Sequence, residues 1–139
     1  MKYVVVSGGH GRLGKLIVPW LKDNGLEVYA PTRGELDWSN ELAVHDAVRR
    51  ADAVLALASY TDVIGAQKDS AKCVADTVTT AQVTIRAVKQ TGASLFYISS
   101  DYVEAVLQAS AGSGVYAASK MVAEQLVLNA GHFAARVAF

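Results

Sequence analysis

Residues 4–14 read VVVSGGHGRLG, a short apolar run that passes directly into a glycine-rich segment. Strands buried inside a parallel sheet are short, continuous and rich in β-branched residues, so the run predicts a strand over Tyr3–Ser7. A helix is predicted over Arg12–Asn24, because the apolar residues there recur at helical spacing. A strand, a glycine turn and a helix in this order are typical of the opening unit of a parallel α/β domain.

The glycines of this turn have separate structural roles. Gly8 permits the tight turn, Gly11 lets the backbone approach a diphosphate, and Gly14 lets the helix pack closely on the sheet. The helix N-terminus offers free N–H groups and a partial positive charge to that diphosphate. The alternative is a tight turn that binds nothing, with His10 at a permissive loop position. The residues expected to contact a dinucleotide here are Gly8, His10, Gly11, Arg12, Leu13 and Gly14.

Further along the chain, short apolar runs alternate with longer helical patterns. The runs predict four more strands, at Glu27–Ala30, Ala53–Ala58, Leu95–Ser99 and Phe133–Phe139. The patterns between them predict three more helices, at Asn40–Arg50, Ser70–Thr91 and Tyr116–Ala130, with Ser39 as the N-cap of the first. Residues 101–115, rich in Ala, Ser and Gly, predict a loop or a short helix near the ligand.

Alternation of strands and helices with short connections requires parallel pairing, because each helix carries the chain back across a face of the sheet. Right-handed crossovers then lead to a Rossmann-type, doubly wound sheet in three layers. We therefore expect one α/β domain over residues 1–139, with the strand order 3-2-1-4-5.

Composition excludes several classes of protein. The chain has 139 residues, 52% of them hydrophobic, with 13 basic and 13 acidic residues, so neither disorder nor general affinity for nucleic acid is expected. No apolar run reaches the roughly 18 residues that span a bilayer, and the first run meets glycine too soon for a signal peptide. Cys73 is the single cysteine, and His45 and His132 lack companions at metal-ligand spacing. We expect a cytoplasmic protein that binds no metal, membrane or nucleic acid.

The end of the second predicted strand bears on the choice of cofactor. Sites selective for NAD usually place an acidic residue there, against the ribose hydroxyls. Here the segment is Ala30-Pro31-Thr32-Arg33, which has no acid. Arg33 and Arg12 can hold a 2′-phosphate through charge-assisted hydrogen bonds, which favours NADP(H) over NAD(H). The alternative is that both arginines are solvated surface charges. Asp37 is expected either to accept a hydrogen bond from the adenine amino group or to cap a helix.

A tyrosine and a lysine stand four residues apart in Tyr116-Ala117-Ala118-Ser119-Lys120, a spacing that puts both side chains on one helix face. An ammonium group about 4 Å from the phenol oxygen would lower the phenol pKa by about three units. Such a tyrosine can exchange a proton with an alcohol or carbonyl oxygen during hydride transfer. Ser100, at the end of the fourth strand, is placed to hydrogen-bond that oxygen. The alternative is an exposed pair on an amphipathic helix.

Together these motifs resemble the extended short-chain dehydrogenase/reductase superfamily, in particular the dTDP-4-dehydrorhamnose reductases and their epimerase and dehydratase relatives. The resemblance implies that Ser100, Tyr116 and Lys120 are catalytic, and that Lys120 also binds the nicotinamide ribose. It implies that Ala58, Ser59 and Tyr60 line the cofactor, and that Asp101 and Tyr102 face the substrate. The stretches that carry the resemblance are Ser7–Gly14, Gly34–Asp37, Ala58–Thr61, Tyr97–Val103 and Val115–Lys120, followed by Glu124.

Three features depart from the pattern of these reductases. The stretch between Ser100 and Tyr116 is short and lacks the usual substrate-loop residues. Thr77 stands near the place of an asparagine that the family commonly carries on the long middle helix. The chain also stops at Phe139, where relatives continue into a C-terminal substrate domain, so a sugar nucleotide is expected to find half a pocket.

The favoured function is a minimal NADP(H)-dependent oxidoreductase acting on a nucleotide sugar or another small carbonyl or alcohol substrate. A homodimer is expected through the helices around 70–91 and 116–130, which commonly pair between subunits in this superfamily. The alternatives are a non-catalytic NAD(P)-binding module or redox sensor, a partner of a separate substrate-binding chain, or a remnant fold with little function. The presence of Ser100, Tyr116 and Lys120 favours catalysis, because a binding module needs neither the serine nor the tyrosine.

Overall fold

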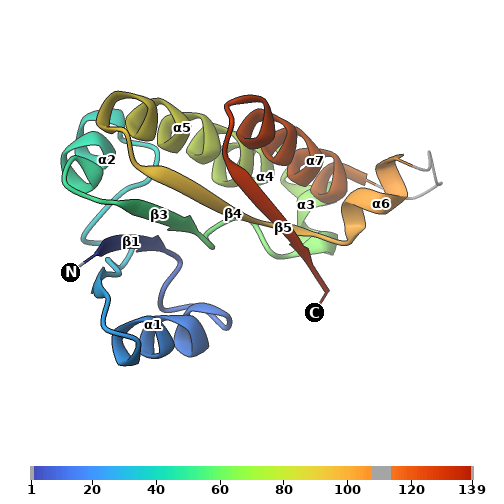
Figure 1. Ribbon diagram of the computed structural model, residues 1–139. Coiled ribbons are helices and arrows are strands. Elements are labelled where there is room, and N and C mark those ends of the chain that lie inside the picture. Colours follow the sequence, from blue (N-terminus) through green and yellow to red (C-terminus); the bar gives the residue numbers. More distant parts are fainter. Residues whose placement is uncertain (1, 108–113, 139) are drawn as a thin grey trace.

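Five parallel strands form one sheet through the middle of the computed structural model, which describes residues 2–107 and 114–138 (Figure 1). The predicted α/β class with a doubly wound parallel sheet is confirmed. Across the sheet the strands lie in the order β2-β1-β3-β4-β5. Their bounds are β1 Tyr3–Ser7, β2 Glu27–Tyr29, β3 Ala53–Ala56, β4 Ser94–Ser100 and β5 Phe133–Val137.

The predicted strand order, 3-2-1-4-5, is wrong for one strand, the third, which was expected at the edge of the sheet. β3 lies between β1 and β4, so that Val4 pairs with Val28 of β2 on one side and with Ala53 of β3 on the other. The helix that follows β1 and the helix that follows β2 lie on opposite faces of the sheet (Figure 1). Right-handed crossovers on opposite faces move in opposite directions, so the chain returns past β1 after β2. The reversal leaves a crevice at the carboxyl ends of β1 and β3, where ligands bind in such sheets.

Helix α1, Gly14–Asp23, lies on one face of the sheet, and α2, α5 and α7 lie on the other (Figure 1). The predicted cap of α2 is off by one residue. Asn40 accepts the N–H of Ala43 at 3.1 Å, whereas the Ser39 hydroxyl donates to Asp37 at 2.6 Å. The remaining helices are α2 Glu41–Val48, α3 Val63–Lys68, α4 Ser70–Val74, the π-helical turn η1 Ala75–Thr79, α5 Thr80–Thr91, α6 Tyr102–Leu107 and α7 Gly114–Asn129.

The long helix expected over 70–91 is present, but its helical geometry changes along its length. It starts as α4, widens into η1 and continues as α5 until Gly92, whose φ of 80° ends it. Isolated π-helical turns occur often at functional sites. The stretch 101–115, expected as a loop or short helix, contains α6, and residues 108–113 of it lie outside the described residues.

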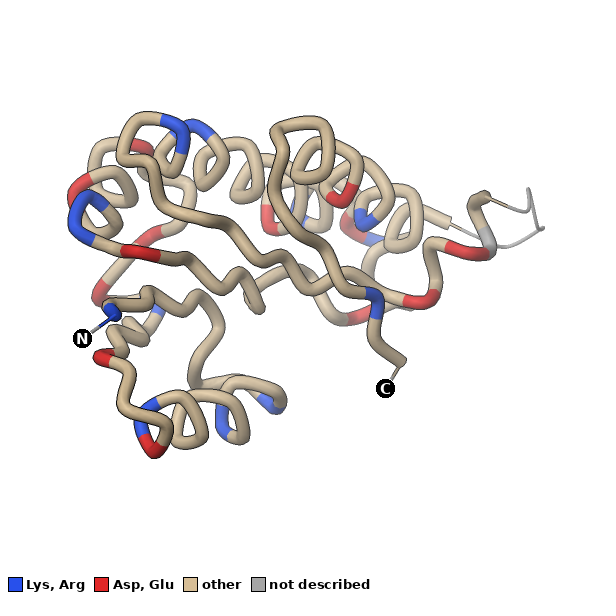
Figure 2. Tube along the Cα trace, viewed as in Figure 1, with Lys and Arg blue, Asp and Glu red and all other residues tan. Residues whose placement is uncertain are grey.

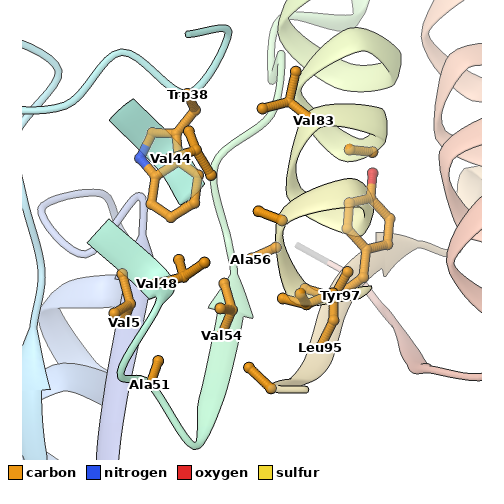
Figure 3. Packing of buried hydrophobic residues seen from close by; sticks show 14 of the residues in the cluster. Val5, Trp38, Val44, Val48, Ala51, Val54, Ala56, Val83, Leu95 and Tyr97 are labelled. Atoms are coloured by element: carbon orange, nitrogen blue, oxygen red, sulfur yellow. The ribbon is translucent and has the colours of Figure 1, made fainter. Parts of the chain in front are cut away.

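The hydrophobic core lies between the sheet and the layer of α2, α5 and α7. In Figure 3, Val5 and Val54 of the strands lie near Val48 of α2, and Leu95 lies beside Tyr97. Each fully buried side chain of this size contributes about 1.5–3 kcal/mol through removal from water. The three middle strands carry no Lys, Arg, Asp or Glu, as the uninterrupted tan of their tubes in Figure 2 shows. This packing fixes the strand ends that carry the site.

The other face of the sheet is covered by α1 over β1 and β2 and is more open beyond them. Phe96 of β4 and Phe133 of β5 point to this side, with ring centroids 4.9 Å apart and stacked, and both remain partly exposed. Within residues 2–107 and 114–138, no helix has the length and apolar character needed to cross a lipid bilayer.

Candidate active site

A cleft of about 1030 Å³ opens at the carboxyl ends of β1, β3 and β4. It brings together residues that lie far apart in the sequence. Ser100, Tyr116 and Lys120, the three predicted catalytic residues, all line it. So do all the predicted cofactor residues except Tyr60, namely Gly8, His10, Gly11, Arg12, Leu13, Gly14, Arg33, Asp37, Ala58, Ser59 and Lys120.

The glycine turn after β1 is packed so closely that it has no room for side chains at Gly8, Gly9 and Gly14. Gly8 has a φ of 70°, and a Cβ there would lie 2.7 Å from the backbone nitrogen of Ala58. A Cβ at Gly14 would lie 2.4 Å from the carbonyl oxygen of Gly8. Contacts under 3.0 Å require the backbone to move, so Gly8 and Gly14 must be glycine for the turn to keep its shape. The turn is therefore a cradle whose inner surface is backbone.

Helix α1 begins at this cradle, where the N–H of Lys15 donates to the carbonyl of Gly11 at 2.9 Å and the N–H of Leu16 to that of Leu13 at 3.1 Å. Leu13, at its N-cap, provides no side-chain hydrogen bond, and the first turn contains no acidic residue. Helix N-termini carry free N–H groups and a partial positive charge that favour an anion. Since a cradle without side chains also admits the anion closely, the segment fits a dinucleotide diphosphate.

His10 ties the cradle to the end of β2. Its Nε2 lies 2.9 Å from the carbonyl oxygen of Ala30. Because a carbonyl can only accept, Nε2 carries the proton in this bond. His10 therefore fixes the distance between the diphosphate cradle and the segment that carries Arg33.

The adenosine end of the cleft holds the two predicted phosphate-binding arginines. Arg12 and Arg33 both line the cleft, and Arg33 is largely exposed, with its Nη2 4.0 Å from Asp76. Asp37 lines the cleft too, and its Oδ1 accepts both the N–H and the hydroxyl of Ser39. These hydrogen bonds from Ser39 hold the pKa of Asp37 below its usual value. The carboxylate thus caps a turn while facing the expected adenine position.

The lining residues that the sequence analysis did not assign to the site include Leu36, Trp38, Asp76 and Thr80. Trp38 is packed in the core at 8% exposure and also lines the cleft. Asp76 and Thr80 are four residues apart and share a helix face. That spacing, next to the position of Thr77, is the signal that could have found them.

The segment after β3 forms the floor between the two halves of the cleft. The N–H of Ala58 donates to the Ser7 hydroxyl at 3.2 Å. The N–H of Tyr60 donates to Thr77 at 3.2 Å, so Thr77 braces this segment from η1. The Tyr60 hydroxyl lies against Gly65 of α3, where a Cβ would approach it to 2.7 Å. Tyr60 therefore supports the floor of the cleft from behind.

Lys120 projects from α7 into the cleft and is 3% exposed. Its Nζ donates to the carbonyl of Ile98 at 2.9 Å and to the Ser59 hydroxyl at 3.1 Å, and it lies 4.8 Å from the centre of the Tyr97 ring. Burial lowers the pKa of Lys120 to about 8, and the charge of Glu124 opposes this shift. The ammonium is thus held by β4 and by the segment after β3.

Tyr116 stands one helical turn before Lys120, and its ring meets the Tyr102 ring edge-on at 5.5 Å. Burial raises the pKa of Tyr116, and a hydrogen bond with Ser100 partly offsets that rise. The expectation that Lys120 lowers this pKa is wrong for the cleft as it stands, because the ammonium is bonded to Ser59 and Ile98. Ser100 itself accepts the N–H of Tyr102 at 3.2 Å and donates to Asp101 at 3.3 Å.

The family model described as the RmlD substrate binding domain matches residues 1–139. The chain belongs to this family. The predicted resemblance to the extended short-chain dehydrogenase/reductase superfamily is thereby confirmed. Among curated relatives, a dTDP-4-dehydrorhamnose reductase of Mycobacterium tuberculosis is 33% identical over 139 residues, which cover 91% of this chain and 46% of the relative.

Solved structures place the RmlD-family chain in the same group. A dTDP-4-dehydrorhamnose reductase of Bacillus anthracis in complex with NADP superposes with a TM-score of 0.88 at 29% identity, over 98% of this chain and 53% of that one. One from Yersinia enterocolitica gives 0.82 at 27% identity, over 94% and 49%. A UDP-glucose 4-epimerase of Brucella ovis in complex with NAD shares the fold, with a TM-score of 0.82 at 20% identity. The chain spans about half the length of the relatives it matches.

Behind the predicted catalytic residues of this RmlD-family cleft lies an ion pair whose carboxylate is buried. Glu124, one turn after Lys120 on α7, is 3% exposed and accepts the guanidinium of Arg136 from β5, with Nε at 3.0 Å and Nη2 at 2.6 Å. Arg136 also pairs with Glu104 of α6. The hydrogen bonds from Arg136 hold the pKa of Glu124 below its usual value. One arginine therefore connects β5 to the two helices that carry Tyr102 and Tyr116.

Proposed function

We propose that this chain binds NADP(H) in the cleft and acts as an oxidoreductase of the short-chain dehydrogenase/reductase type on a nucleotide sugar or a similar small carbonyl or alcohol. The observation that carries the proposal is the convergence of the backbone cradle with Ser100, Tyr116 and Lys120 in one cleft. A relative with 29% identity is a dTDP-4-dehydrorhamnose reductase solved in complex with NADP, which supports both the cofactor and the substrate class.

The residues present fit this cofactor along its length. The cradle between Gly8 and Gly14 would hold the diphosphate with backbone N–H groups. Arg12 and Arg33 would hold the 2′-phosphate, and Asp37 would accept the adenine amino group with its free oxygen. Lys120 and Ser59 stand where the ribose next to the nicotinamide would lie.

When bound, the cofactor supplies or accepts a hydride at the substrate carbon. The chain's own part is to handle the proton at the substrate oxygen. Tyr116 would donate its hydroxyl proton to the carbonyl oxygen as the carbonyl carbon is reduced, and Ser100 would hydrogen-bond the same oxygen. A phenol is already protonated at neutral pH, so Tyr116 carries the proton that this step needs, although burial, by raising its pKa, makes it a weaker acid.

Binding can be tested through tryptophan fluorescence, because Trp38 lines the cleft whereas Trp20 is 62% exposed on α1. NADPH is expected to quench Trp38 and to bind more tightly than NADH. A Trp20→Phe variant serves as the matched control and should keep the quenching. Equal affinities, or tighter binding of NADH, would remove the phosphate-binding role from Arg12 and Arg33.

Catalysis can be tested with Tyr116→Phe, which removes the proton and leaves the ring. Reduction of dTDP-4-dehydrorhamnose with NADPH is expected to fall by at least about 100-fold, the usual size of a general acid effect. The NADPH dissociation constant should stay within about twofold of the parent chain, because the ring contact with Tyr102 is kept. Undiminished turnover would exclude Tyr116 as the proton donor.

The second candidate is a non-catalytic NAD(P)-binding module or a partner of a separate substrate-binding chain. One observation favours it: Lys120 is bonded to Ser59 and Ile98 rather than to Tyr116. A chain that binds NADPH but reduces no carbonyl, alone or with a second chain, would support this module.

We also propose a cytoplasmic location and a homodimer through the helices around 70–91 and 116–130. Val74 of α4 and Val122 and Leu128 of α7 are each more than 40% exposed on these helices. Apolar side chains on neighbouring helices are suited to helix packing between subunits.

A further inference from the structure

Asp76 lies in the wall of the cleft, on the π-helical turn η1. Its Oδ2 accepts Lys72 Nζ at 2.9 Å, one helical turn earlier. The same oxygen lies 4.0 Å from Nη2 of Arg33, which comes from the segment after β2. Arg33 is thus shared between the expected 2′-phosphate and a carboxylate already in the protein.

The position of Asp76 is fixed by its surroundings. The Thr80 hydroxyl donates to the carbonyl of Asp76 at 2.8 Å, within the wide turn. The next residue, Thr77, is 1% exposed and is bonded to the Tyr60 N–H. Since its backbone is tied on both sides, the carboxylate cannot withdraw from Arg33 by a shift of the turn.

We infer that Asp76 is a selectivity residue, which competes for Arg33 and opposes the negative charge of a 2′-phosphate, and so narrows the preference for NADP(H) over NAD(H). The inference rests on the proposed function. A 2′-phosphate next to Arg33 would bring a second anion toward Asp76, and like charges repel. NAD(H) has a neutral hydroxyl at this position and meets no such repulsion.

Asp76→Asn tests this, because it removes the charge and keeps the shape. Dissociation constants for NADPH and NADH are measured by isothermal titration calorimetry. NADPH is expected to bind about fivefold more tightly, the modest size typical of a partly exposed charge, and NADH to change by less than about twofold. The gain for NADPH should shrink as salt is raised to about 0.5 M, because salt screens exposed charges.

Two further variants make the result specific. Asp46→Asn removes an exposed carboxylate that pairs with Arg49 on α2, away from the cleft, and should leave both constants unchanged. In an Arg33→Gln background, the effect of Asp76→Asn on NADPH should be smaller than in the parent chain, because the competition for the guanidinium is gone and only the direct repulsion remains.

The outcomes separate this inference from the proposed function. If the parent chain binds NADPH and Asp76→Asn leaves or weakens that affinity, Asp76 positions Arg33 or does nothing, and the inference is overturned alone. Equal gains for NADPH and NADH also overturn it, because the effect would not concern the 2′-phosphate. If the parent chain binds neither dinucleotide, the proposed function fails and the inference with it.

Discussion

Lys120 brings an ammonium group into a part of the cleft from which most water is excluded. Its partners are a carbonyl and a hydroxyl, Ile98 and Ser59, and neither carries a charge that would offset burial. The pKa of Lys120 falls to about 8 for this reason. Near neutral pH the group is therefore mostly charged, yet it gives up its proton far more readily than a surface lysine.

The lowered pKa makes stability depend on pH in a defined window. An unfolded lysine has a pKa of 10.5, so between pH 8 and 10.5 the unfolded chain holds a proton that the folded chain has lost. Stability from this residue therefore rises with pH across the window. We expect the parent chain to gain about 2 kcal/mol relative to Lys120→Met between pH 7 and 9.5, measured by urea unfolding. Parallel pH profiles for the two chains would contradict the lowered pKa.

Single residues also show what could be read from the sequence. The four-residue spacing of Tyr116 and Lys120 predicts that both reach one cleft, and they do. It does not predict how they pair, because the partners of Lys120 come from β4 and from the segment after β3. Helical periodicity specifies on which face of a helix a side chain lies. Tertiary packing determines which atoms accept hydrogen bonds from the Lys120 ammonium group.

One arginine links three elements of the fold, β5, α6 and α7. Arg136 of β5 pairs with Glu124 of α7 and Glu104 of α6. Glu124 is almost fully buried, so its charge has little access to water. A buried carboxylate that loses the cation bonded to it costs far more than a broken surface pair.

Arg136→Gln is expected to lower the free energy of unfolding by about 3 kcal/mol, because Glu124 would be left as a buried charge. The matched control is Arg86→Gln, which breaks an exposed pair with Glu41 and should cost less than about 1 kcal/mol. Adding Glu124→Gln to Arg136→Gln should restore part of the loss. Chemical denaturation measures the free energy of unfolding of all three variants. Equal losses in the two single variants would show that the burial of Glu124 adds nothing to the contribution of its ion pair.

The elements were predicted better than their arrangement. Strand β1 was placed correctly from its apolar run, and every other strand within a few residues. The strand order was wrong because the direction of a crossover depends on the sheet face that receives the helix. The sequence of the short helix at 41–48 does not indicate which face of the sheet it covers. The π-helical turn was also missed, since an apolar pattern continues through it unchanged.

For the whole molecule, the proposed dimer would cover apolar side chains on α4 and α7. Val122→Glu is expected to convert a dimer into a monomer, because a charge would be buried in the interface. Size-exclusion chromatography with light scattering measures the mass. Leu42→Glu is the matched control, since Leu42 is 84% exposed on α2, outside the proposed interface. A parent chain that is already monomeric would exclude this dimer.

Strand β5 ends the described sheet and has β4 as its hydrogen-bonded neighbour there. An outer strand with free backbone groups can add a strand from another molecule, and this is a common start of aggregation. Phe133 would favour such contact, whereas the guanidinium of Arg136 sets a charge on the same rim. The arginine that anchors two helices therefore also places charge along this outer strand of the described sheet, a feature that disfavours edge-to-edge pairing.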